Sequence, residues 1–517
     1  MVNPKVIFAN EEELQVAILQ AKARGVSDVE IGQTYGVTFR YIEKLITKSK
    51  GVAISALRDS KKVKALHPKD FKEEQATVWS FRQRGTWATH SGEYRGNWSP
   101  YIPRNVILKY SKPGEVILDY FCGAGTTAVE CKLLGRKCIA LDINEKAIDL
   151  TKKNLDFKTE TEKITFIDDE ISLQTYEPQL VVGDARDLSC LNDRSVDLIC
   201  AHPPYTDIIH YTDSKEGDLS FFDLDGFLKE MTKVAKESFR VLKPGRQCAI
   251  LIGDTRKKKH VIPLGFELIN VYLSAGFKLR ELIIKRQHNC KTTGFWYSSS
   301  IRYNFLLLAH EYLAIFEKPK FRVTLGARET IADYGVLFPT LAKPRLKKKL
   351  DERETTTVWI LPEKDFELRL NKNVIDRYSN GDGYSTITFA SNSGNDFSFP
   401  DKGRHKEGLL FIKSPLLAGN PSWVDVDHYL QKTGEVVARG MNNMNDNGFV
   451  VIQTQDVRVN GYIEPLAKKL VDSLSRADIW LKEVIVVVSD TPKPESNTSK
   501  EYLMIAHQYL LVYEVRK

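Results

Sequence analysis

The chain has 517 residues, of which 42% are hydrophobic and 27% charged, so we expect a globular protein of two to four domains. No apolar run approaches the ~18 residues of a membrane span, and the N-terminus does not resemble a secretory signal. Seven cysteines without a CxxC pair exclude a disulfide scaffold and disfavour structural zinc, which indicates a reduced, cytoplasmic protein with no metal site. The net charge of +8 weakly favours a nucleic-acid partner.

Residues 1–60 predict a helix-turn-helix that binds DNA. Ser27 and Asp28 are suitable N-caps, and Gly36 fits the tight turn before the last helix. The three helices are expected over residues 11–23, 29–35 and 39–47. The basic residues that would contact DNA lie in or beside the last helix: Arg40, Lys44 and Lys48. The alternative is an ordinary helical cap that packs against a partner.

Residues 75–320 alternate between short apolar runs and amphipathic segments, a pattern that predicts a doubly wound α/β sheet. One clear helix is expected over residues 224–242. Ligands of such sheets bind outside the carboxyl ends of the strands. The strands are expected over residues 115–121, 137–143, 178–184, 196–202, 247–254 and 281–286.

The first of these strands ends at Asp119 and leads into a Gly-x-Gly loop, Phe121 to Gly125, before a helix that starts at Thr126-Thr127. The next two strands end at Asp142-Ile143 and at Asp184-Ala185. Carboxylates at these positions can accept from ribose hydroxyls and from an adenine amino group, whereas the spacing does not suit a pyrophosphate. A nucleoside without phosphates that is held by carboxylates suggests S-adenosylmethionine. The positive sulfonium of this cofactor also favours acidic neighbours. We therefore predict a Rossmann-like cofactor site that includes Gly123 and Gly125.

The fourth strand ends in His202-Pro203-Pro204-Tyr205. This segment resembles the Asp/Asn/Ser-Pro-Pro-aromatic motif of the exocyclic amino DNA methyltransferases, the N4-cytosine and N6-adenine enzymes. Residues 119–127 resemble the D-P-F-x-G-x-G-T-T cofactor motif of that family. Residues 97–103, with Ser99 and Pro100, resemble the preceding segment that helps to hold the methionine end. The resemblance covers residues 75–320 and implies an S-adenosylmethionine-dependent enzyme.

The family chemistry gives each motif residue a role. The first position and the carbonyl between the prolines accept from the target amine, and the aromatic residue stacks on a base flipped out of the duplex. This sequence departs from the family at Tyr120, where proline is usual, and at His202. A histidine accepts only when neutral, so we expect activity to fall below pH ~6.5. With His202 at the first motif position, both bases are candidates for the modification, and N4 of cytosine is slightly preferred over N6 of adenine.

A basic run follows the fifth strand. Arg256, Lys257 and Lys258 lie at the same sheet edge and are candidates for phosphate contacts, although a solvated basic loop fits equally well. Phe295 to Ser298 either stack on a base or lie in the core.

The last 170 residues repeat parts of the first copy in the same order. Residues 305–313 match 502–510, and residues 279–284 match 481–486. The glycine loop and the Pro-Pro pair fall near residues 389–393 and 411–416, where they are absent. We interpret residues 350–517 as a degenerate second methyltransferase domain, joined by the basic linker 343–349 and packed on the first copy with approximate two-fold symmetry. A generic α/β domain is the alternative.

The sequence thus predicts a DNA methyltransferase whose catalytic domain spans residues 75–320, of a restriction-modification or related defence type. The first rival is an RNA amino-methyltransferase, because tRNA guanosine-N2 enzymes have a similar strand-end motif. The second is a non-enzymatic DNA-binding regulator. The sequence leaves open the recognition site, a paired nuclease or defence protein, and the oligomeric state.

Overall fold

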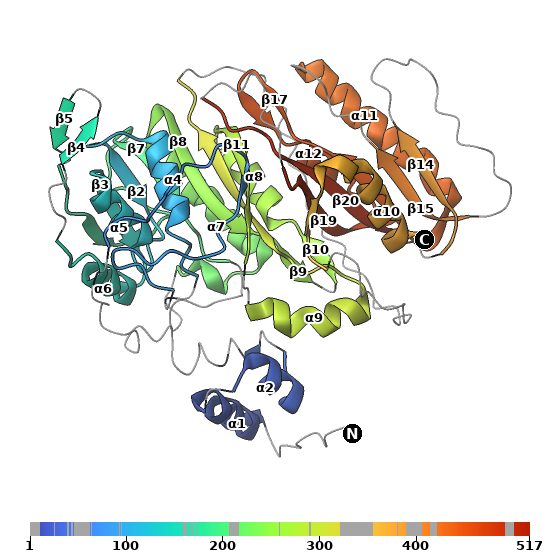
Figure 1. The fold of residues 1–517 in the computed structure, drawn as a ribbon, viewed down its shortest axis with the longest axis horizontal. Coiled ribbons are helices and arrows are strands. Elements are labelled where there is room, and N and C mark those ends of the chain that lie inside the picture. Colours follow the sequence, from blue (N-terminus) through green and yellow to red (C-terminus); the bar gives the residue numbers. More distant parts are fainter. Residues whose placement is uncertain are drawn as a thin grey trace.

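The computed structural model describes a small helical unit and two α/β lobes, the first lobe within residues 65–320 and the second within residues 355–516 (Figure 1). No helix in these described parts is long and apolar enough to cross a membrane. The described residues are 11–24, 26–38, 41–42, 45, 63, 65–92, 94, 96–158, 163–166, 169–172, 174–205, 217–257, 259–288, 291–320, 355–379, 381–388, 406–413, 421–491 and 501–516.

The helical unit contains α1 (Glu11–Ala23) and α2 (Asp28–Tyr35), which lie below the two lobes in Figure 1. The Ser27 hydroxyl accepts from the Glu30 amide, and Gly36 ends α2 with a φ of 69°. Both features agree with the predicted cap and turn. Most of the third predicted helix lies outside the described residues, and so do Arg40, Lys44 and Lys48. DNA reading by this unit stays a prediction.

The first lobe is built on an eight-stranded sheet in the order β1-β11-β12-β8-β7-β2-β3-β6. All neighbours are parallel except β12, which runs antiparallel to β11 and β8. The strands are β1 (Val78–Trp79), β2 (Val116–Asp119), β3 (Lys137–Asp142), β6 (Gln179–Val182), β7 (Val196–Ala201), β8 (Leu242–Gly253), β11 (Lys278–Arg286) and β12 (His310–Glu317). Two small hairpins are β4 (Lys163–Phe166) with β5 (Asp169–Ser172), and β9 (Thr255–Lys257) with β10 (His260–Ile262).

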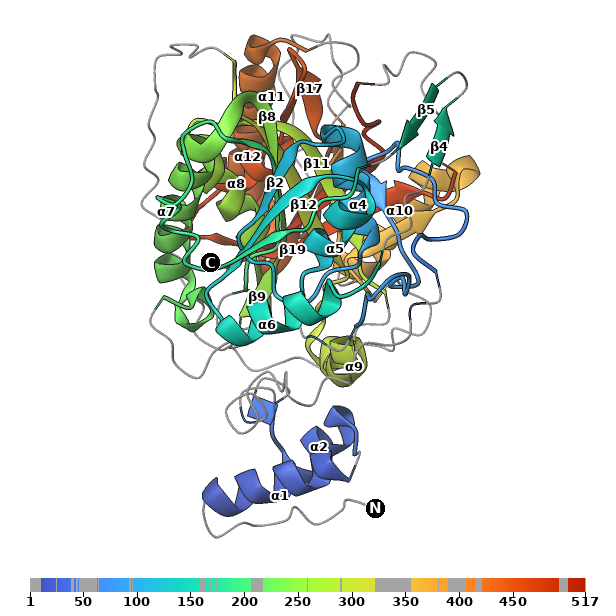
Figure 2. The same cartoon turned by 90° about the vertical axis from the view of Figure 1, so that its left-hand side faces the viewer.

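Helices cover both faces of this sheet, as Figure 2 shows from the side. Alternate residues of a buried strand face opposite sides, so each strand contributes to two cores. Ile117 of β2 packs with α4 and α5, whereas Leu118 packs with α7 and α8. The result is the predicted three-layer, Rossmann-like α/β fold. The helices are α4 (Tyr101–Tyr110), α5 (Thr126–Leu133), α6 (Glu145–Asn154), α7 (Leu224–Val241), α8 (Leu264–Ser274) and α9 (Lys291–Tyr303).

The second lobe repeats this architecture with a six-stranded sheet in the order β13-β19-β20-β16-β15-β14. The pairing directions match β1-β11-β12-β8-β7-β2 one for one, while β3 and β6 have no counterpart among the described residues. The strands are β13 (Val358–Leu361), β14 (Tyr384–Thr388), β15 (Glu407–Lys413), β16 (Met444–Thr454), β17 (Val457–Val459), β18 (Tyr462–Glu464), β19 (Ile479–Ser489) and β20 (His507–Val515). The helices are α10 (Phe366–Tyr378), α11 (Trp423–Gly440) and α12 (Leu466–Ser473), and short 3-10 turns cover Leu219–Phe221, Glu363–Asp365 and Met441–Asn443.

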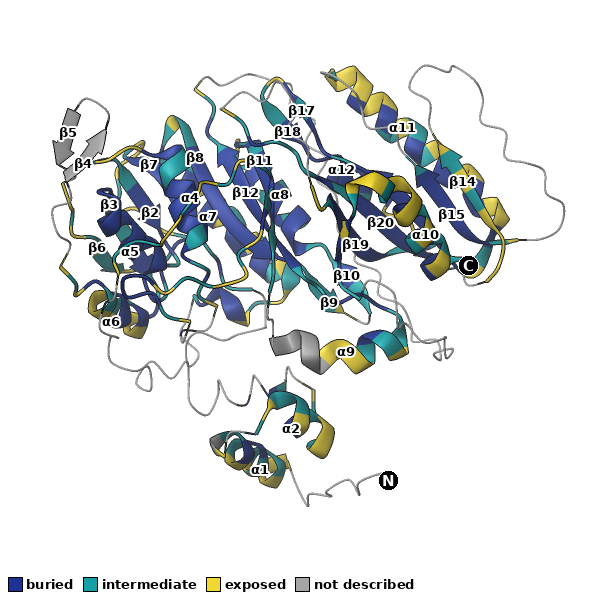
Figure 3. Ribbon diagram, in the orientation of Figure 1, coloured by how far each residue is buried: buried dark blue, intermediate teal, exposed yellow. Residues whose placement is uncertain are grey.

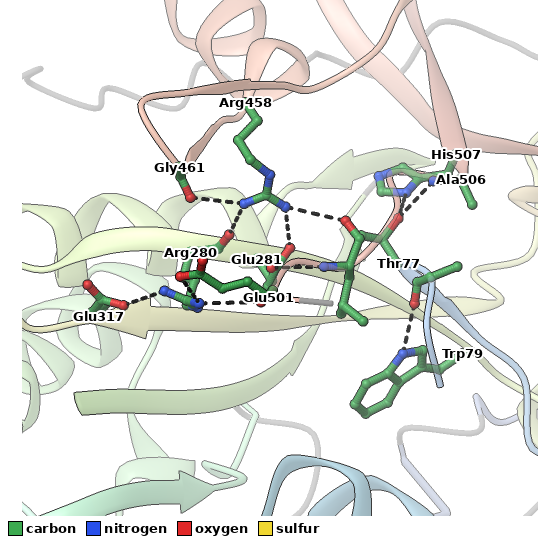
Figure 4. A network of polar contacts seen from close by, with 12 residues as sticks. Thr77, Trp79, Arg280, Glu281, Glu317, Arg458, Gly461, Glu501, Ala506 and His507 are labelled. Atoms are coloured by element: carbon green, nitrogen blue, oxygen red, sulfur yellow. Dashed lines mark hydrogen bonds and ion pairs between the residues drawn. The ribbon is translucent and has the colours of Figure 1, made fainter. Parts of the chain in front are cut away.

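The lobes share one hydrophobic core, in which most of the contributing strand residues are buried (Figure 3). Reciprocal polar contacts lie beside it. Arg458 of β17 donates to the Arg280 carbonyl at 2.8 Å and to the Glu281 carboxylate at 2.6 Å, both in the first lobe (Figure 4). Arg256 of β9 makes the equivalent contacts in the other direction, with the Lys482 carbonyl at 3.1 Å and the Glu483 carboxylate at 2.5 Å.

The exchange extends along the junction. The Thr77 hydroxyl of the first lobe lies 2.9 Å from Nδ1 of His507 in the second, and Thr357 has the same relation to His310 in the first. These paired contacts have the approximate two-fold symmetry expected from the sequence repeat. Arg256 is therefore a junction residue, which corrects its assignment as a phosphate contact. The basic run concealed this role because Glu483 lies 227 positions away in the sequence.

We expect Glu281→Ala to lower the free energy of unfolding by about 3–5 kcal/mol. The fully buried carboxylate also accepts from the Leu503 amide, and its loss would leave Arg458 without this anion. Glu483→Ala should behave in the same way for Arg256. Glu501→Ala is a suitable control, because this carboxylate contacts Arg280 at 3.3 Å but is largely exposed, and it should cost at most about 1 kcal/mol. Urea unfolding measures all three, and an equal loss in Glu281→Ala and Glu501→Ala would contradict the junction.

Candidate active site

A pocket of about 690 Å³, its open mouth included, lies at the carboxyl ends of β2, β3 and β6. The glycine loop after β2 forms one wall. The predicted cofactor residues that line this pocket are Phe121, Gly123, Asp142, Ile143, Asp184 and Ala185. Sequence analysis did not single out Tyr94, Gly217, Asp218 or Leu219, which also line this pocket. The last three follow residues 206–216, which lie outside the described part of the chain.

Asp142 holds the loop in place. One oxygen of its carboxylate accepts from the Gly123 amide and the other from the Asn144 amide, each at 2.9 Å. A Cβ atom on Gly123 would lie 2.9 Å from the Tyr94 ring, and the residue has a φ of 52°, so this position favours glycine. A carboxylate has about four acceptor positions, so Asp142 can bind ribose hydroxyls in addition to these amides.

Asp184 has a more complex setting than the sequence suggested. Its carboxylate accepts from Arg186 through two nitrogens, at 2.6 and 3.0 Å, and Arg186 also contacts Glu230 of α7. A ligand amine would share this carboxylate with Arg186. The contact between Arg186 and Glu230 could not be read from the sequence, because the two residues are 44 positions apart.

Several predicted cofactor residues do not line this pocket, and some of them support the glycine loop. Asp119 is buried, accepts from the Phe121 amide at 3.1 Å, and has a pKa raised to about 7 by that burial. Gly125 caps α5, and the Thr126 hydroxyl bonds to Asn97, whereas Thr127 is wholly buried. Pro100 caps α4, and Ser99 lines the neighbouring cavity and donates to the Arg84 carbonyl. The family motif therefore indicates which segments surround the pocket, but these particular residues do not line it.

A second, larger cavity of about 1080 Å³, its open mouth included, adjoins the first. Gly96, Asn97, Trp98 and His202 line both cavities, Pro203 lines only the larger one, and Pro204 only the smaller. The His-Pro-Pro-Tyr segment thus forms the partition between them. The other residues around the larger cavity are mostly basic or aromatic: Phe81, Arg82, Arg84, Tyr205, Lys285, Arg286, His288 and Glu311.

His202 sits within a polar network at this partition. Its ring stacks on Trp98 at 5.5 Å, and Nε2 lies 3.1 Å from the Tyr205 hydroxyl. The backbone of Gly96 also contacts the ring. Desolvation by the surrounding protein lowers the pKa of His202 to about 4, against a smaller opposing effect of Glu311. The imidazole is therefore neutral at physiological pH.

Glu311, on β12, was missed by sequence analysis. Burial alone would raise the pKa of its carboxyl, but Lys285 and His202 overcome that effect and lower it to about 2. Lys285, on the neighbouring strand β11, donates to Glu311 at 2.7 Å. The signal in the sequence was limited to a lysine near the carboxyl end of β11 and a glutamate near the start of β12.

The remaining predicted DNA contacts stay untested. Lys257 is exposed on β9, and Lys258 lies outside the described residues. Trp296 and Tyr297 of α9 have exposed fractions of 37% and 46%, so they lie on the surface rather than in the core.

A family model described as DNA methylase matches residues 34–153 and 196–402, well over half of the chain. The chain belongs to this DNA methylase family. A second model, described as RNA cap guanine-N2 methyltransferase, matches residues 114–244. The cofactor of the DNA methylase family and of this fold is S-adenosyl-L-methionine. The pocket fits the adenosine of this cofactor, because Asp142 holds the glycine loop and Gly123 lets the backbone approach a ligand closely.

Among curated relatives of this DNA methylase, the type II methyltransferase M.SmaI of Serratia marcescens is 31% identical over 113 residues, 22% of this chain and 37% of that protein. The tRNA (guanine(10)-N2)-dimethyltransferase of Methanothermobacter thermautotrophicus is 32% identical over 113 residues, 22% of this chain and 29% of that protein. The matches span less than half the length of these relatives. The solved structure of TrmN from Thermus thermophilus is 21% identical, with a TM-score of 0.27, 43% of this chain and 50% of that chain covered.

We expect Asp142→Ala to weaken S-adenosyl-L-methionine binding by about 1.5–3 kcal/mol, because the change removes charged hydrogen bonds and loosens the Gly123 loop. Calorimetry of the full chain measures the affinity. Asp149→Ala, an exposed position on the adjacent helix α6, serves as the control and should bind normally. Equal affinities of the two variants would remove Asp142 from the cofactor site.

Proposed function

We propose that this chain transfers a methyl group from S-adenosyl-L-methionine to an exocyclic amino group of a base in DNA, with N4 of cytosine slightly preferred over N6 of adenine. The observation that carries this proposal is the position of His202-Pro203-Pro204-Tyr205 between the two cavities. The smaller cavity suits the cofactor, and the larger one is wide enough for a base. A target amine at the partition would lie beside both.

The residues of the partition have defined tasks in this proposal. S-adenosyl-L-methionine supplies an activated methyl group. His202 and the carbonyl between the prolines accept from the target amine, which orients its nitrogen lone pair toward the cofactor pocket. Trp98, stacked on His202, narrows the partition, and Tyr205 contacts the flipped base. The non-acidic residue at position 202 is the reason for the slight preference for cytosine.

Duplex DNA is the favoured substrate for three reasons. The matching family model is that of a DNA methylase, and M.SmaI is a type II methyltransferase. The rim of the larger cavity carries Arg82, Arg286 and His288, which suits a phosphate backbone. The helical unit of residues 1–60 would add affinity. A restriction-modification or related defence role, with a paired protein, extends the same proposal.

RNA is the second candidate. The match to an RNA cap guanine-N2 methyltransferase model and the similarity to a tRNA (guanine(10)-N2)-dimethyltransferase both favour it. A guanine N2 amine would need the same acceptors at the partition.

We further propose that residues 350–517 are a degenerate, non-catalytic copy that serves as a built-in dimer partner. Its sheet lacks counterparts of β3 and β6 among the described residues, and these strands carry Asp142 and precede Asp184 in the first lobe. The whole chain should therefore bind one S-adenosyl-L-methionine. Arg345, Lys347, Lys348 and Lys349, outside the described residues, would help to position DNA.

The full chain, incubated with methyl-labelled S-adenosyl-L-methionine and duplex DNA, should yield N4-methylcytosine on nucleoside mass spectrometry. Tyr205→Ala should lose this product and keep cofactor binding, since Tyr205 lines only the larger cavity. Single-stranded DNA and tRNA are run in parallel. N6-methyladenine would revise the base, N2-methylguanosine in tRNA would favour the second candidate, and no product from any substrate would refute the proposal.

The acid limb of the pH–rate profile should lie well below 6.5. The pKa of His202 is lowered to about 4, so the ring stays a neutral acceptor above that pH and becomes a cation below it. Single-turnover rates measured down to about pH 4.5 test this expectation. His202→Asn, which restores a family residue, should show no histidine-dependent loss. A wild-type midpoint near 6.5 that disappears in His202→Asn would show a normal histidine pKa instead.

A further inference from the structure

A chain of polar contacts runs along the wall of the larger cavity from β11 to the partition. Lys285 donates to one oxygen of Glu311 at 2.7 Å, and the Tyr205 hydroxyl donates to the other at 2.7 Å. Nε2 of His202 then lies 3.1 Å from that hydroxyl. The chain joins β11, β12 and the segment after β7 at one point of the cavity wall.

The protonation states along this chain follow from its chemistry. Glu311 is ionised beside Lys285, and a carboxylate only accepts hydrogen bonds. The single phenolic proton of Tyr205 therefore points to Glu311. The phenolic oxygen can still accept, so the contact with His202 requires a proton on Nε2. A neutral imidazole with a proton on Nε2 has its lone pair on Nδ1.

The second lobe provides an internal comparison. Lys285 pairs across the sheet with Glu311, and the equivalent pair on β19 and β20 is Val487 with Gln508. A junction histidine lies next to this pair in each lobe, His310 in the first and His507 in the second. A buried ion pair is seldom needed for stability, because an apolar pair of similar size is often as stable. The fold thus tolerates the neutral pair, and the ion pair accompanies the lobe that has the cofactor pocket.

We propose that Glu311 is a positioning residue, which holds the Tyr205 hydroxyl and thereby fixes the proton of His202 on Nε2. Lys285 keeps Glu311 ionised in this arrangement. The backbone of Gly96 also hydrogen-bonds to the imidazole and favours its protonated form, so the contacts with Tyr205 and Gly96 together decide which ring nitrogen accepts from the target amine. The catalytic meaning rests on the proposed methyl transfer, whereas the position of the proton does not.

The charges that face His202 come from three elements. Glu311 on β12 raises the pKa of the imidazole, whereas Lys285 on β11 and Arg84 in the loop before α4 lower it. Removal of Glu311 alone should lower the pKa of His202 further, and removal of Lys285 alone should raise it. A side chain with a purely structural role would move neither value in this pattern.

The decisive variant transfers the residues of the second lobe into the first: Lys285→Val together with Glu311→Gln. It should fold, because the second lobe contains this pair at the same sheet position. S-adenosyl-L-methionine affinity should stay unchanged, since neither residue lines the smaller cavity. The kcat should fall about 10- to 100-fold, the loss known for removal of the partner that orients a metal-ligating histidine. Gln508→Ala, on the matching strand of the second lobe, is the control and should keep full activity.

Nitrogen-15 NMR of the histidine-labelled full chain reads the proton directly, because protonated and bare ring nitrogens have well-separated shifts. The signals of His202 are assigned by their loss in His202→Gln. We expect a proton on Nε2 in the wild type and in Gln508→Ala, and a shift of the proton toward Nδ1 in the double variant and in Tyr205→Phe.

The NMR result and the activity result separate the two proposals. A wild-type His202 with its proton on Nδ1, or a double variant with an unchanged tautomer, would overturn the positioning role even if methylation occurs. Absence of methylation on every nucleic acid, with the expected tautomers, would instead refute the proposed function alone.

Discussion

The reciprocal arginine–glutamate exchange between the lobes is the constraint on which the rest of the molecule depends. Glu281 and Glu483 are almost wholly buried, and a buried carboxylate is costly unless a cation and hydrogen-bond donors meet it. Each donor comes from the opposite lobe, through Arg458 and Arg256. The strands that carry these carboxylates, β11 and β19, therefore cannot face water at the junction with their present sequences. The second lobe is a structural requirement of the first.

The duplication separates residues needed for the fold from residues present for chemistry. Asp254 accepts a hydrogen bond from Tyr312 in the first lobe, and Asp456 lies beside Tyr509 at the equivalent position of the second. Such pairs occur in both copies because both sheets need them. The glycine loop, the Pro-Pro segment and the Lys285–Glu311 pair belong to the first copy alone. Differences between the copies therefore mark the site without any comparison to other proteins.

Local patterns in the sequence predicted most of the architecture. The strands ending at Asp119 and Asp142, the Ser27 cap and the repeat could all be read from periodicity and turn residues, since these depend on neighbours in the chain. Contacts between distant segments could not be read in this way. Arg256 looked like a phosphate ligand because its partner Glu483 is remote, and the contact of Arg186 with Glu230 likewise joins distant segments. Ser99 followed the family motif but lines the larger cavity instead of the smaller one.

The junction and the partition meet on a single strand, β12. Successive residues of a strand face opposite sides of the sheet, so His310 and Tyr312 point one way and Glu311 the other. His310 contacts Thr357 of the second lobe, and Glu311 contacts Tyr205 at the partition. The two contacts are one residue apart on a strand that is hydrogen-bonded on both sides. A change in the register of β12 would move both together, so the seating of the second lobe also fixes the position of the carboxylate that faces His202.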